Sequence, residues 1–473
     1  MSLDVTSKLE KTTYDRKACA IGVIHLGFGA FHRGHQSVYV DDVMEKTGDL
    51  RWGIAAVNLR AADAAAFAEH ARETDGYIVK AMSPDGAVSH RSVRSHVAYC
   101  DWSTTPVEAE ALMALGSVHL VTITVTESGY FTDPAGALNG NDPVIMDEMA
   151  GGTPVSVYAY LTAALSARQQ ATGQKLTIMC CDNIRQNGKM LQRNFDSYLR
   201  LAGHLELADW VSENVTFPCS MVDRITPRAT PELRTEVEAS YGANPASPIM
   251  AETFSQWVLE DRFAGPRPDF GAVGVTVTDD VDPYEETKIR ILNGGHTCLS
   301  YMAALKGIAT FDSAMADPDL NTHFWNYEQG EVLPAITIDL PFDKAAYLDS
   351  IAARFGNSSI ADSIERICAD GFAKFPIFVR PTLEGCLKQG KMPVMGLRSA
   401  ASWYIFAKHI AAGKLGISYL EPSWDLLEPM LTSDGLDGFT RSKPLWGDLP
   451  EQYPDFAPTL QAQIKELEKT WPV

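Results

Sequence analysis

The pattern of hydrophobic and polar positions changes near residue 283. Before that point, short apolar runs alternate with amphipathic stretches, which predicts buried strands at 18–26, 52–59, 118–125 and 176–181, an antiparallel pair at 77–82 and 88–99, and helices at 61–72 and 155–170. Beyond it the patterns are mostly helical, as at 297–306, 343–355, 360–370, 399–412 and 459–469. This change predicts an α/β fold, with a Rossmann-like doubly wound domain over 1–283 and a mostly α-helical domain over 284–473.

A glycine-rich turn follows the first predicted strand. In GFGAFHRGHQ, Gly27 and Gly29 precede an apparent helix that runs through Val43. Bare backbone at such a turn lets a dinucleotide pyrophosphate approach, and the helix start favours its charge. His32 stands where the usual third glycine would be, so the fingerprint is incomplete. Arg33 could face a phosphate or be an ordinary solvated helix residue.

Polar residues also stand at the ends of the later strands. At the end of the second strand, where an acid usually binds the adenosine ribose, Asn58 is followed by Arg60, which leaves NAD and NADP both open. Thr126 and Glu127 follow the strand at 118–125, and such clusters are where doubly wound sheets hold ligands. Asn183, after the strand at 176–181, is either an oxygen-binding amide or a turn residue.

The stretch DPYEETKIRILNGGHT predicts a helix with chemical groups on one broad face. At 100° per residue, Lys288, Asn293 and His296 fall at about 0°, 140° and 80° around the axis. Gly294 and Gly295 interrupt the helix and suggest the close approach of a ligand or another backbone. A lysine base, an amide donor and an imidazole suit oxidation of an alcohol. The alternative is an amphipathic helix with a surface lysine and a buried histidine.

Composition and charge argue against several kinds of partner and site. The 473 residues allow two domains, and the formal net charge of −20 argues against nucleic acid and anionic membranes as partners. Eight cysteines without a CxxC pair and the absence of zinc-ligand spacing argue against a disulfide framework and a metal site. The charged start of the chain and the lack of a long apolar run predict a cytoplasmic protein. As a separate expectation, the protein is a monomer or a small homo-oligomer.

Five sequence blocks together resemble one enzyme family, the long-chain, zinc-independent polyol dehydrogenases, which include mannitol 2-dehydrogenase, D-arabinitol 4-dehydrogenase and fructuronate reductase. The blocks are GFGAFHRGHQ, VTESGY, CDNIRQNG, MVDRITPR and KIRILNGGHT. Within the family, the chain looks most similar to the D-arabinitol 4-dehydrogenases. The resemblance implies that Lys288 is the general base, that Asn293 and Asn183 hold the reacting oxygen, and that His296 helps to position it. It also implies substrate contacts from Asp223, Arg366 and Lys374.

These inferences predict NAD-dependent oxidation of a secondary hydroxyl of a small-molecule polyol to a ketose, D-arabinitol to D-xylulose or D-mannitol to D-fructose. NADP stays possible as the cofactor. The predicted cofactor-binding residues are Gly27, Phe28, Gly29, Ala30, Phe31, Arg33, Asn58, Thr126 and Glu127. The alternatives are a fructuronate or tagaturonate reductase of the same family, a decarboxylating dehydrogenase of phosphorylated sugar acids, and a non-catalytic dinucleotide sensor. The decarboxylating dehydrogenase would need a cluster of arginines for the phosphate, and the sequence near residues 282–307 contains no such cluster.

Overall fold

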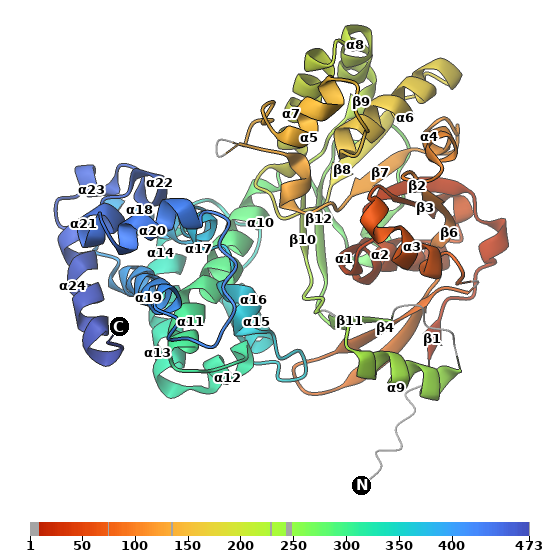
Figure 1. The fold of residues 1–473 in the computed structure, drawn as a ribbon. Coiled ribbons are helices and arrows are strands. Elements are labelled where there is room, and N and C mark those ends of the chain that lie inside the picture. Colours follow the sequence, from red (N-terminus) through yellow and green to blue (C-terminus); the bar gives the residue numbers. More distant parts are fainter. Residues whose placement is uncertain (1–8, 74, 134–135, 228, 243–247, 473) are drawn as a thin grey trace. The chain divides into compact units, whose positions relative to one another are not determined.

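Six parallel strands form the main sheet of the N-terminal part of the chain (Figure 1). The structure is a computed structural model that describes residues 9–73, 75–133, 136–227, 229–242 and 248–472. In spatial order the strands are β6 (His96–Asp101), β3 (Gly53–Asn58), β2 (Ile21–Leu26), β7 (Leu120–Ile123), β8 (Leu176–Cys180) and β9 (Val215–Thr216). The chain moves outward from β2 in one direction and from β7 in the other. Doubly wound sheets bind ligands at such a switch point, at the carboxyl ends of the strands.

Alternating side chains of these strands bury both faces of the sheet. Ile24 and Leu26 belong to a core with residues of α4, α6, α7 and α8, whereas Val23 packs in a separate core with α2. The helices of this part are α1 (Ala30–Gly34), α2 (Gln36–Thr47), α3 (Ala64–His70), α4 (Pro106–Met113), α5 (Pro143–Met149), α6 (Val157–Ala171), α7 (Asn187–Leu201), α8 (Leu205–Asn214) and α9 (Pro231–Tyr241). The doubly wound fold predicted from the strand–helix alternation is therefore confirmed.

Two smaller sheets complete this part of the chain. One has the order β1 (Glu10–Lys11), β5 (Val88–Val93), β4 (Tyr77–Met82), β11 (Ile249–Glu252), and the other β10 (Ser220–Asp223), β12 (Gln256–Glu260), β13 (Thr276–Thr278). The prediction of one strand over 88–99 was wrong. The antiparallel partner of β4 ends at Val93, and the chain then enters the main sheet as β6, parallel to β3.

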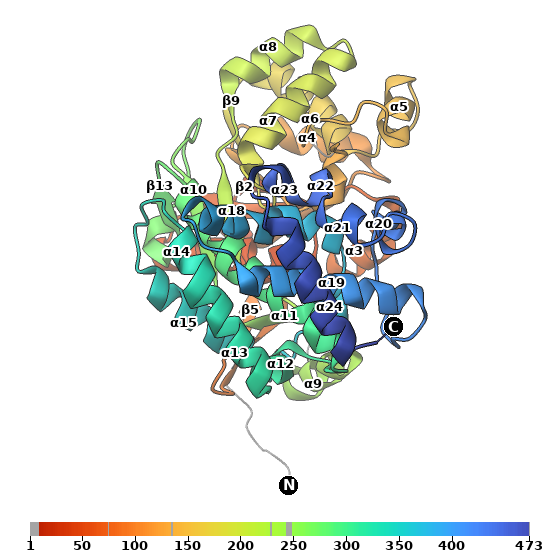
Figure 2. The same cartoon turned by 90° about the vertical axis from the view of Figure 1, so that its left-hand side faces the viewer.

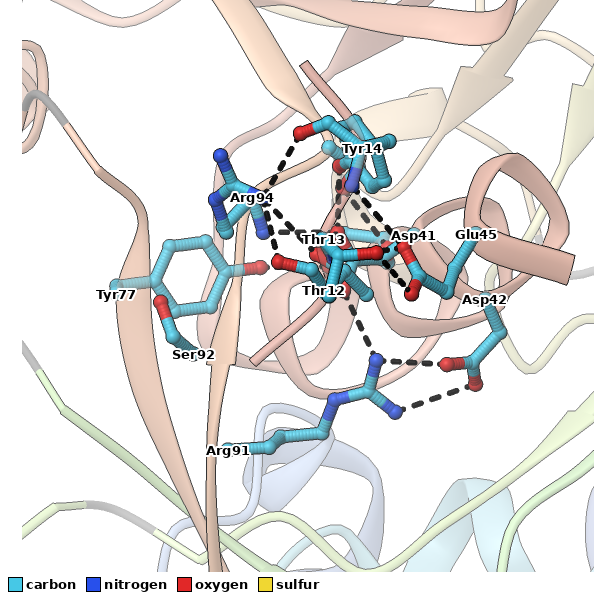
Figure 3. A network of polar contacts seen from close by, with 12 residues as sticks. Thr12, Thr13, Tyr14, Asp41, Asp42, Glu45, Tyr77, Arg91, Ser92 and Arg94 are labelled. Atoms are coloured by element: carbon cyan, nitrogen blue, oxygen red, sulfur yellow. Dashed lines mark hydrogen bonds and ion pairs between the residues drawn. The ribbon is translucent and has the colours of Figure 1, made fainter. Parts of the chain in front are cut away.

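A buried polar network attaches the start of the described chain to α2 (Figure 3). The Asp41 carboxylate, fully buried, accepts hydrogen bonds from the Tyr14 hydroxyl at 2.6 Å and from the backbone N–H of Arg94 at 3.0 Å. Arg91 donates to Asp41 at 2.9 Å and to Asp42 at 2.7 Å. A buried carboxylate needs such partners, because burial without them is costly.

From Pro283 onward the chain forms a second compact unit that is almost entirely helical. Its central helix, α11 (Gly294–Leu305), packs against α19 (Val394–Ala411), which also contacts α24 (Phe456–Thr470) (Figure 2). Three segments are π-helical: η6 (Lys288–Asn293), η7 (Glu328–Val332) and η8 (Phe375–Val379). The remaining longer helices are α12 (Phe311–Ala316), α13 (Pro318–Tyr327), α15 (Lys344–Phe355), α16 (Ile364–Cys368), α18 (Arg380–Lys388), α20 (Trp424–Leu431) and α21 (Gly435–Thr440). The predicted helical character of this region is confirmed.

Candidate active site

The glycine turn after β2 has the geometry that a dinucleotide loop needs. Gly27 has φ +90°, and a Cβ there would lie 2.0 Å from the carbonyl oxygen of Thr124, so no other residue fits. Gly29 is different. It is exposed at the start of α1, has φ −86°, and a Cβ there would meet only the Gly27 oxygen, at 4.0 Å. Protein packing therefore does not require glycine at position 29, whereas a phosphate that approaches the bare backbone would.

Buried histidines lie beneath this turn, a feature that the sequence analysis did not identify. His25 Nε2 lies 2.9 Å from the Gly27 carbonyl oxygen, and the His25 ring stacks on the His32 ring with centroids 3.2 Å apart. His32 Nε2 lies 2.9 Å from His96 Nε2. Burial lowers the pKa of His25 to about 3 and that of His32 well below its usual value, so both rings are neutral at physiological pH. The stacked imidazoles occupy the place where a third glycine would bring helix and strand together.

The predicted helix through Val43 is broken at His35 into α1 and α2. Arg33, in α1, is buried, and its guanidinium lies 5.3 Å from the Phe28 ring centroid and 5.7 Å from that of Tyr77. The alternative of a solvated helix residue is therefore wrong. The contact places Arg33 under the aromatic side chain of the turn and not at its surface.

An acid does stand beside the end of β3, although it comes from another strand. Asn58 is only 6% exposed, and its amide nitrogen donates to the Arg60 carbonyl at 2.9 Å and to Asp101 Oδ1 at 3.0 Å. Asp101 is the last residue of β6 and pairs with Asn58 in register. The pattern of residues 88–99 predicted one strand, so the place of Asp101 at the end of β3 became visible only when β6 was seen to pair with β3.

Strained backbone marks the carboxyl ends of β7 and β8. Thr126, Phe131 and Gln186 have φ of 65°, 47° and 50°, and they account for three of the five non-glycine residues with positive φ in the described ranges. Such conformations cost about 1–3 kcal/mol each and concentrate at functional sites. The predicted residues Thr126 and Glu127 lie in the segment that follows β7, and the exposed Asn183 lies in the loop after β8. Asp223 is buried at the end of β10.

In the helical unit, Lys288 and Asn293 are the first and last residues of π-helix η6. The helix is continuous from α10 (Asp282–Thr287) into α11, so the predicted interruption at the glycines is wrong. The backbone N–H of Gly294 donates to the Ile289 carbonyl, five residues earlier. Hydrogen bonding between residues five apart widens the turn, so the angle between Lys288 and Asn293 around the helix axis is smaller than the 140° of a regular α-helix. Such π-turns are frequent at functional sites.

The glycines after the π-turn allow other segments to approach it closely. A Cβ on Gly294 would lie 3.1 Å from the Phe378 carbonyl oxygen in η8, and one on Gly295 would lie 3.0 Å from Glu328 Oε1 in η7. Close approach of another backbone, one of the two predicted reasons for these glycines, is therefore what the structure shows. Lys288 is only 7% exposed, which excludes the alternative of a surface lysine.

His296 lies between two phenylalanine rings, stacked on Phe355 with centroids 4.2 Å apart and edge-on to Phe311 at 4.7 Å. Burial lowers its pKa to about 3, with the nearby charges of Arg366 and Lys374 adding to this effect. All three predicted residues thus lie within the continuous helix formed by η6 and α11. A neutral imidazole can hydrogen-bond an alcohol oxygen, but it is a weak base.

The two predicted substrate cations already have protein partners. Arg366, with 64% of its side chain exposed, pairs with Asp362 through Nε at 2.9 Å and also through Nη2. Lys374 Nζ donates to the Ile367 carbonyl oxygen at 2.8 Å, and burial lowers its pKa. Within the described ranges, no cluster of three or more histidine, cysteine or acidic side chains is arranged to bind a metal, and no helix is long and apolar enough to span a bilayer.

A doubly wound sheet with a bare glycine turn after its first strand defines the class of dinucleotide-binding proteins, and in this chain a helical unit follows that sheet. Residues 21–271 match the model of the mannitol dehydrogenase Rossmann domain, and residues 280–467 match that of the mannitol dehydrogenase C-terminal domain. The chain belongs to the mannitol dehydrogenase family of oxidoreductases, so the resemblance inferred from the five sequence blocks is confirmed.

Individual relatives are similar over almost their whole length. D-arabinitol 4-dehydrogenase of Ralstonia nicotianae is 34% identical over 90% of this chain and 92% of its own. Mannitol 2-dehydrogenase of Cereibacter sphaeroides is 35% identical over 90% and 88%. Among solved structures, the Pseudomonas fluorescens mannitol 2-dehydrogenase ternary complex with NAD and D-mannitol has a TM-score of 0.88 and 29% identity, and covers 98% of this chain and 95% of that one.

Proposed function

We propose that this protein is a polyol dehydrogenase that oxidises a secondary hydroxyl of a sugar alcohol to a ketose, with NAD as cofactor and D-arabinitol as substrate. The observation that carries the proposal is the π-turn, which starts at the buried Lys288 and ends at Asn293. The relatives named D-arabinitol 4-dehydrogenase and mannitol 2-dehydrogenase support the polyol class. We further propose that the first unit binds the dinucleotide and the helical unit supplies the base.

Each candidate site residue has its own role in the proposed oxidation. Bound NAD supplies the acceptor for the hydride that leaves the carbinol carbon. Lys288 removes the hydroxyl proton, and the amides of Asn293 and Asn183 donate hydrogen bonds to the oxygen as it gains negative charge. The neutral His296 ring, fixed between Phe355 and Phe311, orients that oxygen. Asp223 accepts hydrogen bonds from hydroxyls of the polyol chain.

The carboxylate of Asp101, which lies beside the end of β3, supports NAD as the cofactor. Asn58 carries no charge, but Asp101 Oδ1 lies 3.0 Å from its amide nitrogen. A carboxylate at this strand end can bind ribose hydroxyls and repels the 2′-phosphate of NADP. Gly27 and Gly29 leave the backbone bare for the pyrophosphate, and Thr126 and Glu127 lie at the switch point where the nicotinamide half is expected.

Reduction of a uronate is less favoured than oxidation of a polyol. A uronate reductase needs a cation for the substrate carboxylate, and Arg366 and Lys374, the candidates for this role, are engaged with Asp362 and with the Ile367 carbonyl. A dinucleotide sensor has no use for a buried lysine and an amide at the two ends of a π-turn. Both alternatives make different predictions in the same assay.

Initial rates with D-arabinitol, D-mannitol and D-sorbitol, each with NAD and NADP, test the proposal directly. The reverse reaction is measured with D-xylulose, D-fructose, fructuronate and tagaturonate. We expect the highest kcat/KM with D-arabinitol and NAD, and the product identifies the carbon: oxidation at C4 gives D-xylulose and at C2 D-ribulose. Turnover of uronates alone would support the reductase, and no turnover of any substrate would support the sensor.

A further inference from the structure

The Asp182 carboxylate connects the loops that leave β7 and β8. Asp182 lies two residues after the end of β8, yet its Oδ2 accepts a hydrogen bond from the Val125 backbone N–H at 2.9 Å and its Oδ1 accepts one from the Thr126 N–H at 3.1 Å. The Tyr130 hydroxyl donates to Oδ2 at 2.7 Å. The Asp182 side chain, in the loop after β8, therefore binds both backbone groups and the Tyr130 side chain of the segment after β7.

The backbone that Asp182 holds is the most strained part of this edge. Thr126 has φ 65° and ψ 163°, a region that is populated almost only by glycine, and its β-branched side chain makes the conformation still less favourable. Such a conformation persists only where surrounding contacts determine it. The two amide hydrogen bonds to a charged acceptor are contacts of this kind, and charge-assisted hydrogen bonds are about twice as strong as neutral ones.

We propose that Asp182 is a positioning residue: its carboxylate fixes the loop from Val125 to Tyr130 in the shape that receives the dinucleotide and, through its own backbone, fixes the adjacent Asn183. The inference rests on the proposed function, because it takes Thr126 and Glu127 as dinucleotide neighbours and Asn183 as a ligand of the reacting oxygen. The Asp182 backbone is itself held, since Asn187 Nδ2 at the start of α7 donates to its carbonyl at 3.1 Å.

The charge on this carboxylate depends on pH in the range where enzymes are assayed. Burial raises the pKa of Asp182 to about 6, and the Glu127 carboxylate adds to the rise, while the hydrogen bonds from Tyr130, Val125 and Thr126 oppose it. The Tyr130 phenol and the thiols of Cys180 and Cys181 also face it, and all three are buried with raised pKa values and therefore neutral. As the pH falls through about 6, Asp182 gains a proton, and a protonated oxygen accepts the loop N–H groups poorly.

Equilibrium titration of NADH, followed by its fluorescence between pH 5 and 8, tests this inference with Asp182→Asn. An asparagine can accept one loop N–H but presents its own donor to the other. At pH 7.5 we expect NADH to bind about 10-fold more weakly to the variant than to the wild type. The wild type should lose affinity below pH 6, and the variant should not show this dependence.

Asp49→Asn is the matched control. Asp49 also accepts a backbone N–H and the Trp52 indole N–H, at 3.3 and 2.8 Å, but it precedes β3, at the amino ends of the strands. Its variant should bind NADH like the wild type at every pH. Wild-type affinity together with wild-type pH dependence in Asp182→Asn would overturn the inference.

Tyr130→Phe provides a second test that keeps the carboxylate and the ring. The Tyr130 hydrogen bond lowers the pKa of Asp182, so its loss should move the midpoint of the pH dependence upward. An unmoved midpoint would count against Asp182 as the titrating group. Because NADH binding is measured without turnover, a wild type that binds NADH but oxidises no polyol would refute the catalytic part of the proposed function alone. A wild type that does not bind NADH would overturn both proposals.

Discussion

Alanine substitutions at Gly27 and Gly29 should have different effects, the first mainly on the stability of the fold and the second mainly on dinucleotide binding. At Gly29, φ −86° and ψ 176° are open to any residue, and a Cβ would meet only the Gly27 oxygen at 4.0 Å. Gly29→Ala should therefore leave the folded state intact and increase the free energy of unfolding by about 0.4–1 kcal/mol, because alanine restricts the unfolded chain. The added methyl group, however, occupies the space through which the pyrophosphate approaches the backbone.

The magnitude of the binding loss follows from the size of one methyl group. Forcing an extra methyl into a close contact costs about 1–3 kcal/mol. At about 1.4 kcal/mol for each factor of ten, NADH should bind roughly 5- to 150-fold more weakly to Gly29→Ala. Gly27→Ala is the contrasting variant, because φ +90° adds about 1–3 kcal/mol of strain to a Cβ that would lie 2.0 Å from the Thr124 oxygen. Its main effect should be a loss of stability, of about 2–6 kcal/mol once the overpacking is included.

Urea denaturation and fluorescence titration with NADH, applied to both variants and the wild type, provide the two measurements. The expected result is a stable Gly29→Ala protein that binds NADH poorly, and a destabilised Gly27→Ala protein. If Gly29→Ala bound NADH with wild-type affinity, the turn after β2 would not be the pyrophosphate site. If it were strongly destabilised, the argument that protein packing leaves space at Gly29 would be wrong.

Three further results are expected. Lys288→Ala should lower the maximal rate of polyol oxidation by about 10²–10⁴-fold and leave NADH affinity unchanged, and the rate should no longer rise with pH, as it does when a base must lose its proton. Lys306→Ala, at the exposed end of the same helix, is the control and should keep the wild-type rate. Equal rates for both variants would exclude Lys288 as the base. Asp101→Asn should raise NADP efficiency relative to NAD, and an unchanged ratio would place the ribose elsewhere. Burial raises the pKa of Glu331 to about 7, so the folded state binds its proton more tightly than the unfolded chain does. The free energy of unfolding should therefore decrease as the pH rises from about 4.5 to 7, and this contribution should be constant above pH 7. Glu331→Gln should show a smaller slope than the wild type in urea melts at pH 5, 6 and 8, and equal slopes for the two proteins would contradict the assignment.

The π-turn changes how the helix at 282–305 is understood. A regular α-helix would place Lys288 and Asn293 on rather different sides, and the two glycines would only weaken it. In the structure, the glycines admit the Phe378 carbonyl of η8 and the Glu328 side chain of η7 against the turn. The cost of the glycines in helix propensity is thus offset by packing, which also holds the lysine away from solvent.

The sequence alone determined the fold class, the positions of four of the six main-sheet strands along the chain, and the family. Each of these depends on local information: apolar runs such as 118–125 predict buried strands wherever they occur, and the five blocks keep their order along the chain. It also predicted Lys288, Asn293 and Gly27 as candidate site residues, because a lysine and an amide in one helix and a glycine after a strand are visible without knowledge of their neighbours.

Only the tertiary structure decided which residues meet. Asp101 reaches Asn58 because β6 pairs with β3, and Asp182 reaches Thr126 because β8 lies beside β7. The π-turn at Lys288 depends on η7 and η8, which are about 40 and 90 residues away in the chain. Contacts between residues far apart in sequence are set by packing and strand pairing, and no single stretch of the chain contains them.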